Sequence, residues 1–146
     1  FNEEVAEVFE DMIDRSIPGY SSSLKLIENL TRKYFQNKSF CYDLGCSLGA
    51  STACLIKAIE NREGKVHAID NSKAMISSCN DKFNHFIDSQ KVIFSKKDIE
   101  TAEIKDASIV VINFVLQFIN SSRRESLLKK VFSGMKKNGL IRYHQV

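Results

Sequence analysis

The chain has 146 residues, 21 of them Lys or Arg and 18 Asp or Glu, and its formal net charge at pH 7 is +3. With 43% hydrophobic residues, a chain of this length is predicted to form one domain, residues 1–146, around an ordinary hydrophobic core, which excludes intrinsic disorder. The small net charge does not support the strongly basic surface of a dedicated nucleic-acid binder. We therefore expect no direct nucleic-acid partner.

The sequence also gives no support for a membrane protein, a metal-binding protein or a disulfide-bonded protein. The most apolar stretch, Ile109–Ile119, has 11 residues, whereas a membrane-spanning helix needs about 20, and no signal-peptide pattern opens the chain. The four cysteines contain no C-x-x-C pair, and the three histidines are scattered. This pattern favours a reduced, cytoplasmic protein with no metal and no membrane partner.

In chain order, two helices are predicted first, over residues 3–15 and from Ser21 to about Phe35, separated by Pro18-Gly19 and followed by a loop at 36–39. From residue 40 onward, short β-rich runs alternate with helical patterns, which is typical of βαβ units. The predicted strands are 40–44, 65–70, 91–95 and 108–114, the predicted helices are 50–60, 73–86 and 123–136, and residues 140–146 are compatible with a fifth strand.

These elements predict an α/β protein: a Rossmann-like open, mostly parallel sheet with helices on both faces and an N-terminal helical prefix. The last helix is predicted to begin with a capping box formed by Ser122 and Glu125, and to end near Asn138-Gly139.

The sharpest motif is the loop Asp43-Leu44-Gly45-Cys46-Ser47-Leu48-Gly49, which ends the first predicted strand and opens the next helix. In open α/β sheets, ligands bind at such carboxyl ends of strands, where the strand order reverses. Gly45 permits a tight turn, and Gly49 permits close approach of helix and strand. The G-x-x-x-G spacing lacks the additional glycine that admits a pyrophosphate, so it favours a nucleoside ligand without a diphosphate over NAD or FAD. A tight turn without a ligand is the alternative.

Two acidic residues follow at the ends of the next strands. Asp70 comes 21 residues after Gly49, close to the roughly 20-residue offset of a ribose-binding carboxylate, and Ser72 is a predicted N-cap. Past the third strand, the Asp98 carboxylate and the Ile99 N–H have the chemistry to read the amino group and ring nitrogen of adenine. The alternative for Asp70 is a solvated strand end, and the alternative for Asp98 is an exposed acidic residue in a loop.

Asn113 interrupts an apolar run at the carboxyl end of the fourth predicted strand. A buried unpaired amide costs about 1–3 kcal/mol, so its partners must be a bound ligand or neighbouring backbone. Gln117 is predicted on a surface helix or turn, and the Cys46 side chain is expected to turn inward as a small hydrophobe.

Four segments together resemble the class I S-adenosylmethionine-dependent methyltransferase fold: the glycine loop, residues 68–72, Asp98-Ile99 and residues 113–118. The opening segments, 5–9, 11–13 and Arg15-Ser16-Ile17-Pro18-Gly19-Tyr20-Ser21, are similar to the carboxy-S-adenosyl-L-methionine synthases, a branch of that superfamily. The resemblance runs from Phe1 to about Gly139. It implies an enzyme that converts S-adenosylmethionine and prephenate to phenylpyruvate and a carboxylated sulfonium, which a separate enzyme uses to carboxymethylate a tRNA wobble uridine.

The same resemblance implies a ligand site, and it also implies a homodimer. The nine implied ligand-binding residues are Tyr20 from the N-terminal segment, Gly45, Cys46 and Ser47 at the methionine part, Asp70 and Asn71 at the ribose, Asp98 and Ile99 at the adenine, and Asn113 near the sulfonium. The expected ligands are S-adenosyl-L-methionine as substrate or its carboxylated product, with prephenate as second substrate. The resemblance assigns no catalytic residue.

The resemblance also implies that the chain lacks the family's C-terminal part. There the family carries an Arg that pairs with the new carboxylate, beyond Val146, and Arg123 and Arg124 are expected to face solvent. Two alternatives stand beside the synthase. One is an ordinary S-adenosylmethionine methyltransferase, although the sequence has neither an Asn/Asp-Pro-Pro-aromatic segment nor a Pro-Cys nucleophile. The other is a non-catalytic nucleotide-binding α/β domain.

Overall fold

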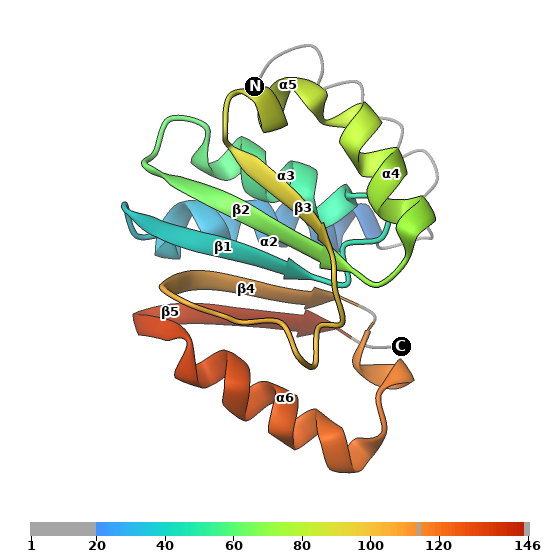
Figure 1. The fold of residues 1–146 in the computed structure, drawn as a ribbon. Helices are drawn as coiled ribbons and strands as arrows, with labels where there is room; N and C mark the ends of the chain where they lie inside the picture. Colours follow the sequence, from blue (N-terminus) through green and yellow to red (C-terminus); the bar gives the residue numbers. More distant parts are fainter. Residues whose placement is uncertain (1–19, 114, 145–146) are drawn as a thin grey trace.

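The computed structural model describes residues 20–113 and 115–144, which form one five-stranded sheet (Figure 1). The strand order is β3-β2-β1-β4-β5, and every neighbouring pair is parallel. The strands are β1 (Ser39–Leu44), β2 (Gly64–Asp70), β3 (Val92–Lys96), β4 (Ala107–Asn113) and β5 (Met135–His144). The predicted Rossmann-like α/β fold is confirmed. The helix predicted at 3–15 lies outside the described residues.

Helices cover both faces of the sheet. One face carries α2 (Tyr20–Tyr34), α3 (Ala50–Ile59), α4 (Lys73–Lys82) and α5 (Asn84–Asp88), and the other carries the 3-10 turn η1 (Leu116–Phe118) and α6 (Ser121–Ser133) (Figure 1). Gln117 lies in η1, on a turn as predicted. Among the described residues, none of these helices has the length and apolar character needed to cross a membrane.

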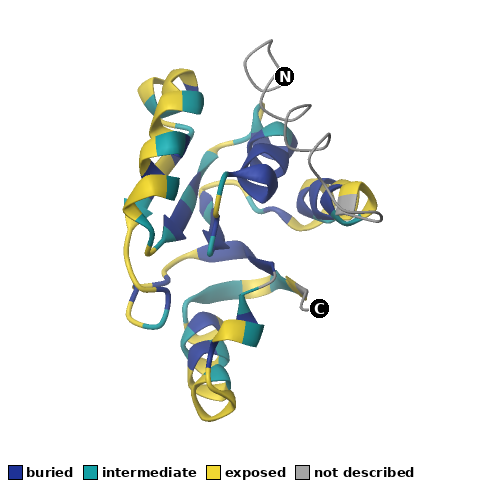
Figure 2. Cartoon of the chain, turned by 90° about the vertical axis from the view of Figure 1, so that its right-hand side faces the viewer, coloured by how far each residue is buried: buried dark blue, intermediate teal, exposed yellow. Residues whose placement is uncertain are grey.

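The alternation of side chains along β4 explains why two cores form. All of β4 is buried, and Ile109 and Val111 pack with α2 and α3, whereas Val110 and Ile112 pack with η1 and α6. Successive strand residues point to opposite faces, so a strand covered on both sides reads as a continuous apolar run. Figure 2 shows this buried centre between more exposed outer helix faces. The central strands β1 and β4 are therefore held rigidly from both sides.

The helix predicted over 73–86 is interrupted. It ends at Lys82, and α5 begins at Asn84, because the backbone leaves the helical region at Phe83 (φ −105°, ψ 19°). The Phe83 ring is fully buried, with its centroid 5.1 Å from that of Phe94 on β3. Burial of this aromatic pair on the sheet has overridden the helical pattern.

The predicted limits of the last helix are also wrong. Asn120 is the N-cap, and its Oδ1 accepts a hydrogen bond from the Ser122 N–H at 3.0 Å, in place of the predicted Ser122–Glu125 capping box. The helix ends at Ser133 with Gly134 as its C-cap, and Gly134 lies so close to Ile104 that a Cβ there would be 2.1 Å from its carbonyl oxygen.

The fifth strand begins at Met135, earlier than the sequence indicates. Its pairing with β4 shifts between Ala107↔Met135 and Ile109↔Leu140, and the additional residues include Asn138 at φ 68°. An Asn-Gly pair in which Asn138 has a positive φ suits a bulge as well as a helix end, so the sequence pattern misplaced this boundary.

Candidate functional site

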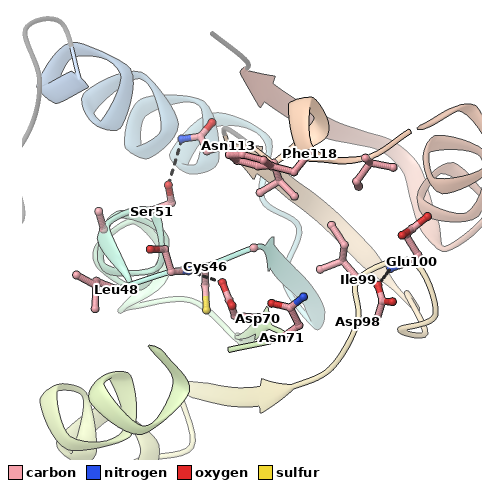
Figure 3. Close-up of a pocket in the computed structure, with 15 residues that line it drawn as sticks. Cys46, Leu48, Ser51, Asp70, Asn71, Asp98, Ile99, Glu100, Asn113 and Phe118 are labelled. Atoms are coloured by element: carbon pink, nitrogen blue, oxygen red, sulfur yellow. Dashed lines mark hydrogen bonds between the residues drawn. The ribbon is translucent and has the colours of Figure 1, made fainter. Parts of the chain in front are cut away.

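A cavity of about 650 Å³ lies at the carboxyl ends of the strands, around the junction of β1, β2 and β4 (Figure 3). Eight of the nine predicted site residues line it: Gly45, Cys46, Ser47, Asp70, Asn71, Asp98, Ile99 and Asn113. The side chain of Tyr20 lies outside the described part of the chain. The structure thus brings together residues that span almost 70 positions of the sequence, and their contact with a ligand stays a prediction.

The glycine loop forms one wall of this cavity and has no room for side chains at its glycines. Gly45 has φ +79°, and a Cβ there would be 2.3 Å from the Val115 side chain. Gly49 has φ +94°, and a Cβ there would be 2.7 Å from the Phe83 ring. The Gly45 N–H donates to the Ile69 carbonyl oxygen at 2.7 Å, which ties the loop to the end of β2. The tight turn expected at Gly45 is confirmed, whereas the close neighbours of Gly49 are Cys79 and Phe83 at the end of α4 and not a strand.

The amino-terminal end of α3 opens on the cavity. Its N-cap is Gly49, which has no side chain to cap the helix, and the first helical residues Ala50 and Ser51 line the cavity. Free N–H groups in the first helical turn carry partial positive charge and favour a negatively charged or carbonyl group of a ligand.

Asp70 is held in one orientation by the backbone on both sides of it. Its Oδ2 accepts a hydrogen bond from the Ser47 N–H at 3.0 Å, and its Oδ1 accepts one from the Ser72 N–H at 2.9 Å. A carboxylate has about four acceptor positions, so capacity is left for two neighbouring hydroxyls. Ser72 is the N-cap of α4, as predicted, and its Oγ accepts from the Met75 N–H at 3.3 Å.

The segment 98–100 forms the opposite wall. Asp98 Oδ1 accepts a hydrogen bond from the Glu100 N–H at 2.9 Å, while Asp98 Oδ2 receives none from the described residues. The Ile99 N–H likewise donates to no described acceptor. Adjacent residues therefore offer a free carboxylate oxygen and a free N–H, and apolar side chains of Val115 and Ile119 also line the cavity.

Asn113 carries an unsatisfied oxygen at the cavity. Its Nδ2 donates to Ser51 Oγ at 3.2 Å, whereas Oδ1 is buried without a hydrogen-bond partner among the described residues (Figure 3). Asn113 is 8% exposed and Ser51 is 5% exposed. The amide group thus pairs with a side chain and not with the backbone, and its free oxygen lacks the partner that a ligand would supply. Sequence analysis missed Ser51; its only signal was a polar residue in the first turn after Gly49.

Beneath the loop lies a second pair that sequence analysis missed. Asp43 is 1% exposed, and Thr52 Oγ1 donates to its Oδ2 at 2.7 Å. Burial and, to a smaller extent, the charge of Asp70 raise the pKa of the Asp43 carboxyl to about 7, against the opposing effect of the Thr52 hydrogen bond. This pair fixes α3 to the end of β1 and so sets the shape of the loop between them.

Cys46 turns inward as expected and joins the core formed with α2 and α3. A hydrogen bond with Cys79 and burial both raise the pKa of its thiol, so it is not a thiolate nucleophile at neutral pH. The described residues contain no group of three His, Cys, Asp or Glu arranged to hold a metal ion.

The two arginines at the start of α6 differ from each other. Arg123 is exposed, as predicted, and its Nε lies 3.4 Å from Glu100 Oε1. Arg124 is half-buried, contrary to the expectation, because its Nε donates to the Ile119 carbonyl oxygen at 2.8 Å. Neither residue lines the cavity.

Comparison with solved structures relates this arrangement to one fold. Coclaurine N-methyltransferase, bound to N-methylheliamine and SAH, superposes with a TM-score of 0.70 at 22% identity, covering 85% of this chain and 34% of that one. An SAH-bound methyltransferase of Podospora anserina superposes with a TM-score of 0.68 at 14% identity, covering 97% and 61%. At these identities the similarity shows the fold alone.

Sequence comparison is more specific. The chain is 43% identical over 141 residues to the carboxy-S-adenosyl-L-methionine synthase of Shewanella pealeana, and 43% identical over 142 residues to that of Idiomarina loihiensis. Each match covers 97% of this chain and 58% of the relative, so the chain spans less than two thirds of the length of these relatives. Residues 42–139 match the family described as "Methyltransferase domain". The resemblance seen in the sequence is confirmed by these relatives, and the chain belongs to the methyltransferase domain family.

Proposed function

We propose that the protein binds S-adenosyl-L-methionine in the cavity at the carboxyl ends of β1, β2 and β4, and that it is a carboxy-S-adenosyl-L-methionine synthase. The observation that carries the proposal is the identity of about 42% over 97% of the chain to relatives with that name. The cavity adds physical support, because eight of the nine residues implied by the resemblance line it together.

The cavity walls fit the parts of this ligand. Asp70 offers fixed carboxylate oxygens to ribose hydroxyls, and the Asp98 carboxylate with the Ile99 N–H offers an acceptor and a donor to the edge of adenine. The glycine loop packs so closely against Val115 and Phe83 that neither Gly45 nor Gly49 can carry a Cβ. The unsatisfied Asn113 Oδ1 is a partial negative charge that complements a sulfonium or ammonium group. These acceptor and donor groups therefore suit a positively charged nucleoside without phosphates.

The chemistry comes from the substrates. The positive sulfur acidifies the attached methyl group, and the overall reaction takes S-adenosylmethionine and prephenate to carboxy-S-adenosyl-L-methionine, phenylpyruvate and water, with the carboxyl group of prephenate becoming the new carboxylate. The part of the chain described here binds and orients: Asp70 and Asp98 hold the nucleoside, and Asn113 faces the positive end.

The proposal extends to the setting of the reaction. The carboxylated product would serve a separate enzyme that carboxymethylates a wobble uridine in tRNA, so this protein would act in the cytoplasm without contacting nucleic acid. A homodimer is proposed from the same family resemblance. Arg123 and Arg124 are engaged outside the cavity, so neither of them is placed to pair with the new carboxylate.

The test is a reaction of the full-length protein with S-adenosylmethionine and prephenate, followed by mass spectrometry. The expected products are phenylpyruvate and a sulfonium heavier by one carboxyl group, without accumulation of S-adenosylhomocysteine. The 146-residue chain should bind S-adenosylmethionine but turn it over far more slowly. No Arg of residues 20–113 and 115–144 lines the cavity, and a carboxylate in a desolvated site without a bidentate Arg loses a charge-assisted contact.

The family match also favours a second candidate, an ordinary S-adenosylmethionine-dependent methyltransferase. Rapid formation of S-adenosylhomocysteine with a tRNA or small-molecule acceptor, independent of prephenate, would contradict the synthase and favour this candidate. Failure of the folded protein to bind either compound would instead favour a non-catalytic domain.

A further inference from the structure

Two cations of α6 hold the segment 98–100 at the edge of the cavity. Lys130 Nζ donates a hydrogen bond to the Ile99 carbonyl oxygen at 2.5 Å, and Arg123 Nε lies 3.4 Å from Glu100 Oε1. Lys130 is half-buried and does not line the cavity. Its contact is to the backbone of the segment, whereas the Arg123 contact is between two side chains near the surface.

The Lys130 contact controls the orientation of a peptide plane. The Ile99 carbonyl and the Glu100 N–H belong to the same rigid peptide unit, and the Glu100 N–H donates to Asp98 Oδ1 at 2.9 Å. On the other side, the Asp98 carbonyl oxygen accepts from the N–H groups of Thr101 and Ala102 at 3.2 and 3.0 Å. Both peptide units next to Ile99 are thus fixed, and only one of them depends on a distant side chain.

The charges around Lys130 match this role. Burial lowers the pKa of its ammonium group, while the carboxylates of Asp98 and Glu100 raise it. A cation that is bonded to a backbone carbonyl and attracted by two carboxylates of the same segment stabilises the turn, since hydrogen bonds with a charged donor are stronger than neutral ones. Without it, the Ile99–Glu100 peptide loses its only described side-chain donor and can rotate, which releases the Asp98 carboxylate.

We propose that Lys130 is a positioning residue that, through the Ile99–Glu100 peptide unit, holds the free Asp98 oxygen in place for use with the free Ile99 N–H as an acceptor–donor pair, and thereby makes the cavity select a 6-aminopurine over a 6-oxopurine. The proposal rests on the proposed function, because it concerns the nucleoside end of the same site. Adenine presents a donor at its 6-amino group and an acceptor at N1. Hypoxanthine presents an acceptor at O6 and a donor at N1. Its O6 would therefore face the Asp98 carboxylate, and its N1–H would face the Ile99 N–H, so that neither hydrogen bond could form.

The chain offers a closely matched control. Lys129 is the neighbouring residue on α6, but its ammonium is exposed and pairs with Glu125 within the same helix at 3.2 Å. Lys130→Met and Lys129→Met therefore remove the same charge from the same helix, and only the first removes a contact with the segment 98–100. Lys130→Arg keeps a cationic donor at the position.

The binding test uses the full-length protein and calorimetry with S-adenosyl-L-homocysteine and S-inosyl-L-homocysteine. The wild type and Lys129→Met should both prefer the adenosyl compound. Lys130→Met should lose roughly tenfold in adenosyl affinity and most of the preference, which is the scale expected for one charge-assisted hydrogen bond, and Lys130→Arg should recover part of both. An unchanged preference in folded Lys130→Met would overturn the proposal.

A second measurement needs no ligand. Amide hydrogen exchange at Glu100 should be faster in Lys130→Met than in the wild type or Lys129→Met, because its N–H loses the fixed acceptor Asp98 Oδ1. Should Lys130→Met not fold, Lys130→Gln replaces it in both experiments, with the same expected directions. Unchanged exchange would overturn the positioning contact itself. A wild type that binds neither nucleoside would instead refute the proposed function, while the exchange data would still judge the contact.

Discussion

The two walls of the cavity are built in different ways. The glycine-loop wall, residues 43–52 with Asn113, is backed by the core, and its contacts are to backbone or buried side chains such as Asp43, Thr52 and Ser51. The wall formed by segment 98–100 contains an exposed carboxylate and depends on cations of α6. The first wall is shaped by close packing and the second by charge. Substitutions in the first should therefore affect binding and stability together, and those in the second mainly binding.

The largest effect is expected from Gly45→Val, which should abolish binding of S-adenosylhomocysteine. The residue has φ +79°, and its new side chain would collide with Val115. Gly45→Ala in a Val115→Ala background should recover part of the affinity, because the collision is removed while the backbone strain stays. Calorimetry and thermal unfolding measure both effects. Unaltered titration curves for Gly45→Val would show that the loop does not hold the ligand.

Asp70→Ala should weaken binding by about 1.5–3 kcal/mol, roughly tenfold to a hundredfold in affinity, the usual range for hydrogen bonds to a charged group. Asp70 stands at the end of β2, between the two walls, with both oxygens held by backbone N–H groups. Asp81→Ala, which removes an exposed carboxylate from α4, is the control. Equal affinities of the two variants, measured by calorimetry, would refute the ribose assignment.

The stability contributed by the glycine-loop wall should depend on pH. The pKa of Asp43 is raised from 3.8 to about 7 in the folded state, so folding takes up a proton between these values. Its contribution to stability is present below pH 4 and is lost as the pH rises toward 7. Asp43→Asn should therefore flatten this part of the pH profile of the unfolding free energy.

Denaturant unfolding from pH 4 to pH 8, taken as the difference between wild type and Asp43→Asn, isolates this residue. His67, whose pKa is lowered by burial and by Lys65 and Lys97, is present in both proteins, and its opposite contribution cancels in the difference. A difference that does not change with pH would mean that Asp43 is ionised in the folded protein as it is in the unfolded chain.

The smallest effect is expected from Arg123→Gln. Its ion pair with Glu100 is exposed on the Arg side, and such pairs contribute about 0–1 kcal/mol. Affinity for S-adenosylhomocysteine should change by less than about fivefold, and the effect should shrink further in high salt. A loss as large as that of Lys130→Met would show that both cations, and not the backbone contact alone, hold the segment.

The sequence was sufficient to predict the site residues whose positions follow from the topology of the sheet. Gly45, Asp70, Asp98 and Asn113 each stand where a strand ends or just after it, and parallel strands bring their carboxyl ends to one edge, so local patterns were enough to bring them together. The contact of Lys130 with Ile99 could not be predicted, because it joins residues 31 positions apart and depends on how α6 packs against the sheet.

The errors in the predicted element boundaries can each be traced to particular residues. Phe83 leaves the helix to bury its ring, and Asn138-Gly139 form a strand bulge where the same residue types also mark helix ends. Ser51 and Thr52 were overlooked because polar residues in a first helical turn usually signify capping or solvent contact. Their real partners are contributed by β1 and β4, which only the tertiary structure reveals.

The strand order has a consequence for how the site is assembled during folding. β1 pairs with β2 over about 25 positions, as in Cys41↔Val66, but with β4 over about 68, as in Cys41↔Ile109. Closing the longer loop costs more chain entropy, and contacts of long sequence separation slow folding. The part of the cavity that contains Gly45 and Asp70 belongs to one contiguous stretch, whereas Asn113 arrives only when β4 docks beside β1. Ligand affinity should therefore emerge late in refolding, after most helix formation.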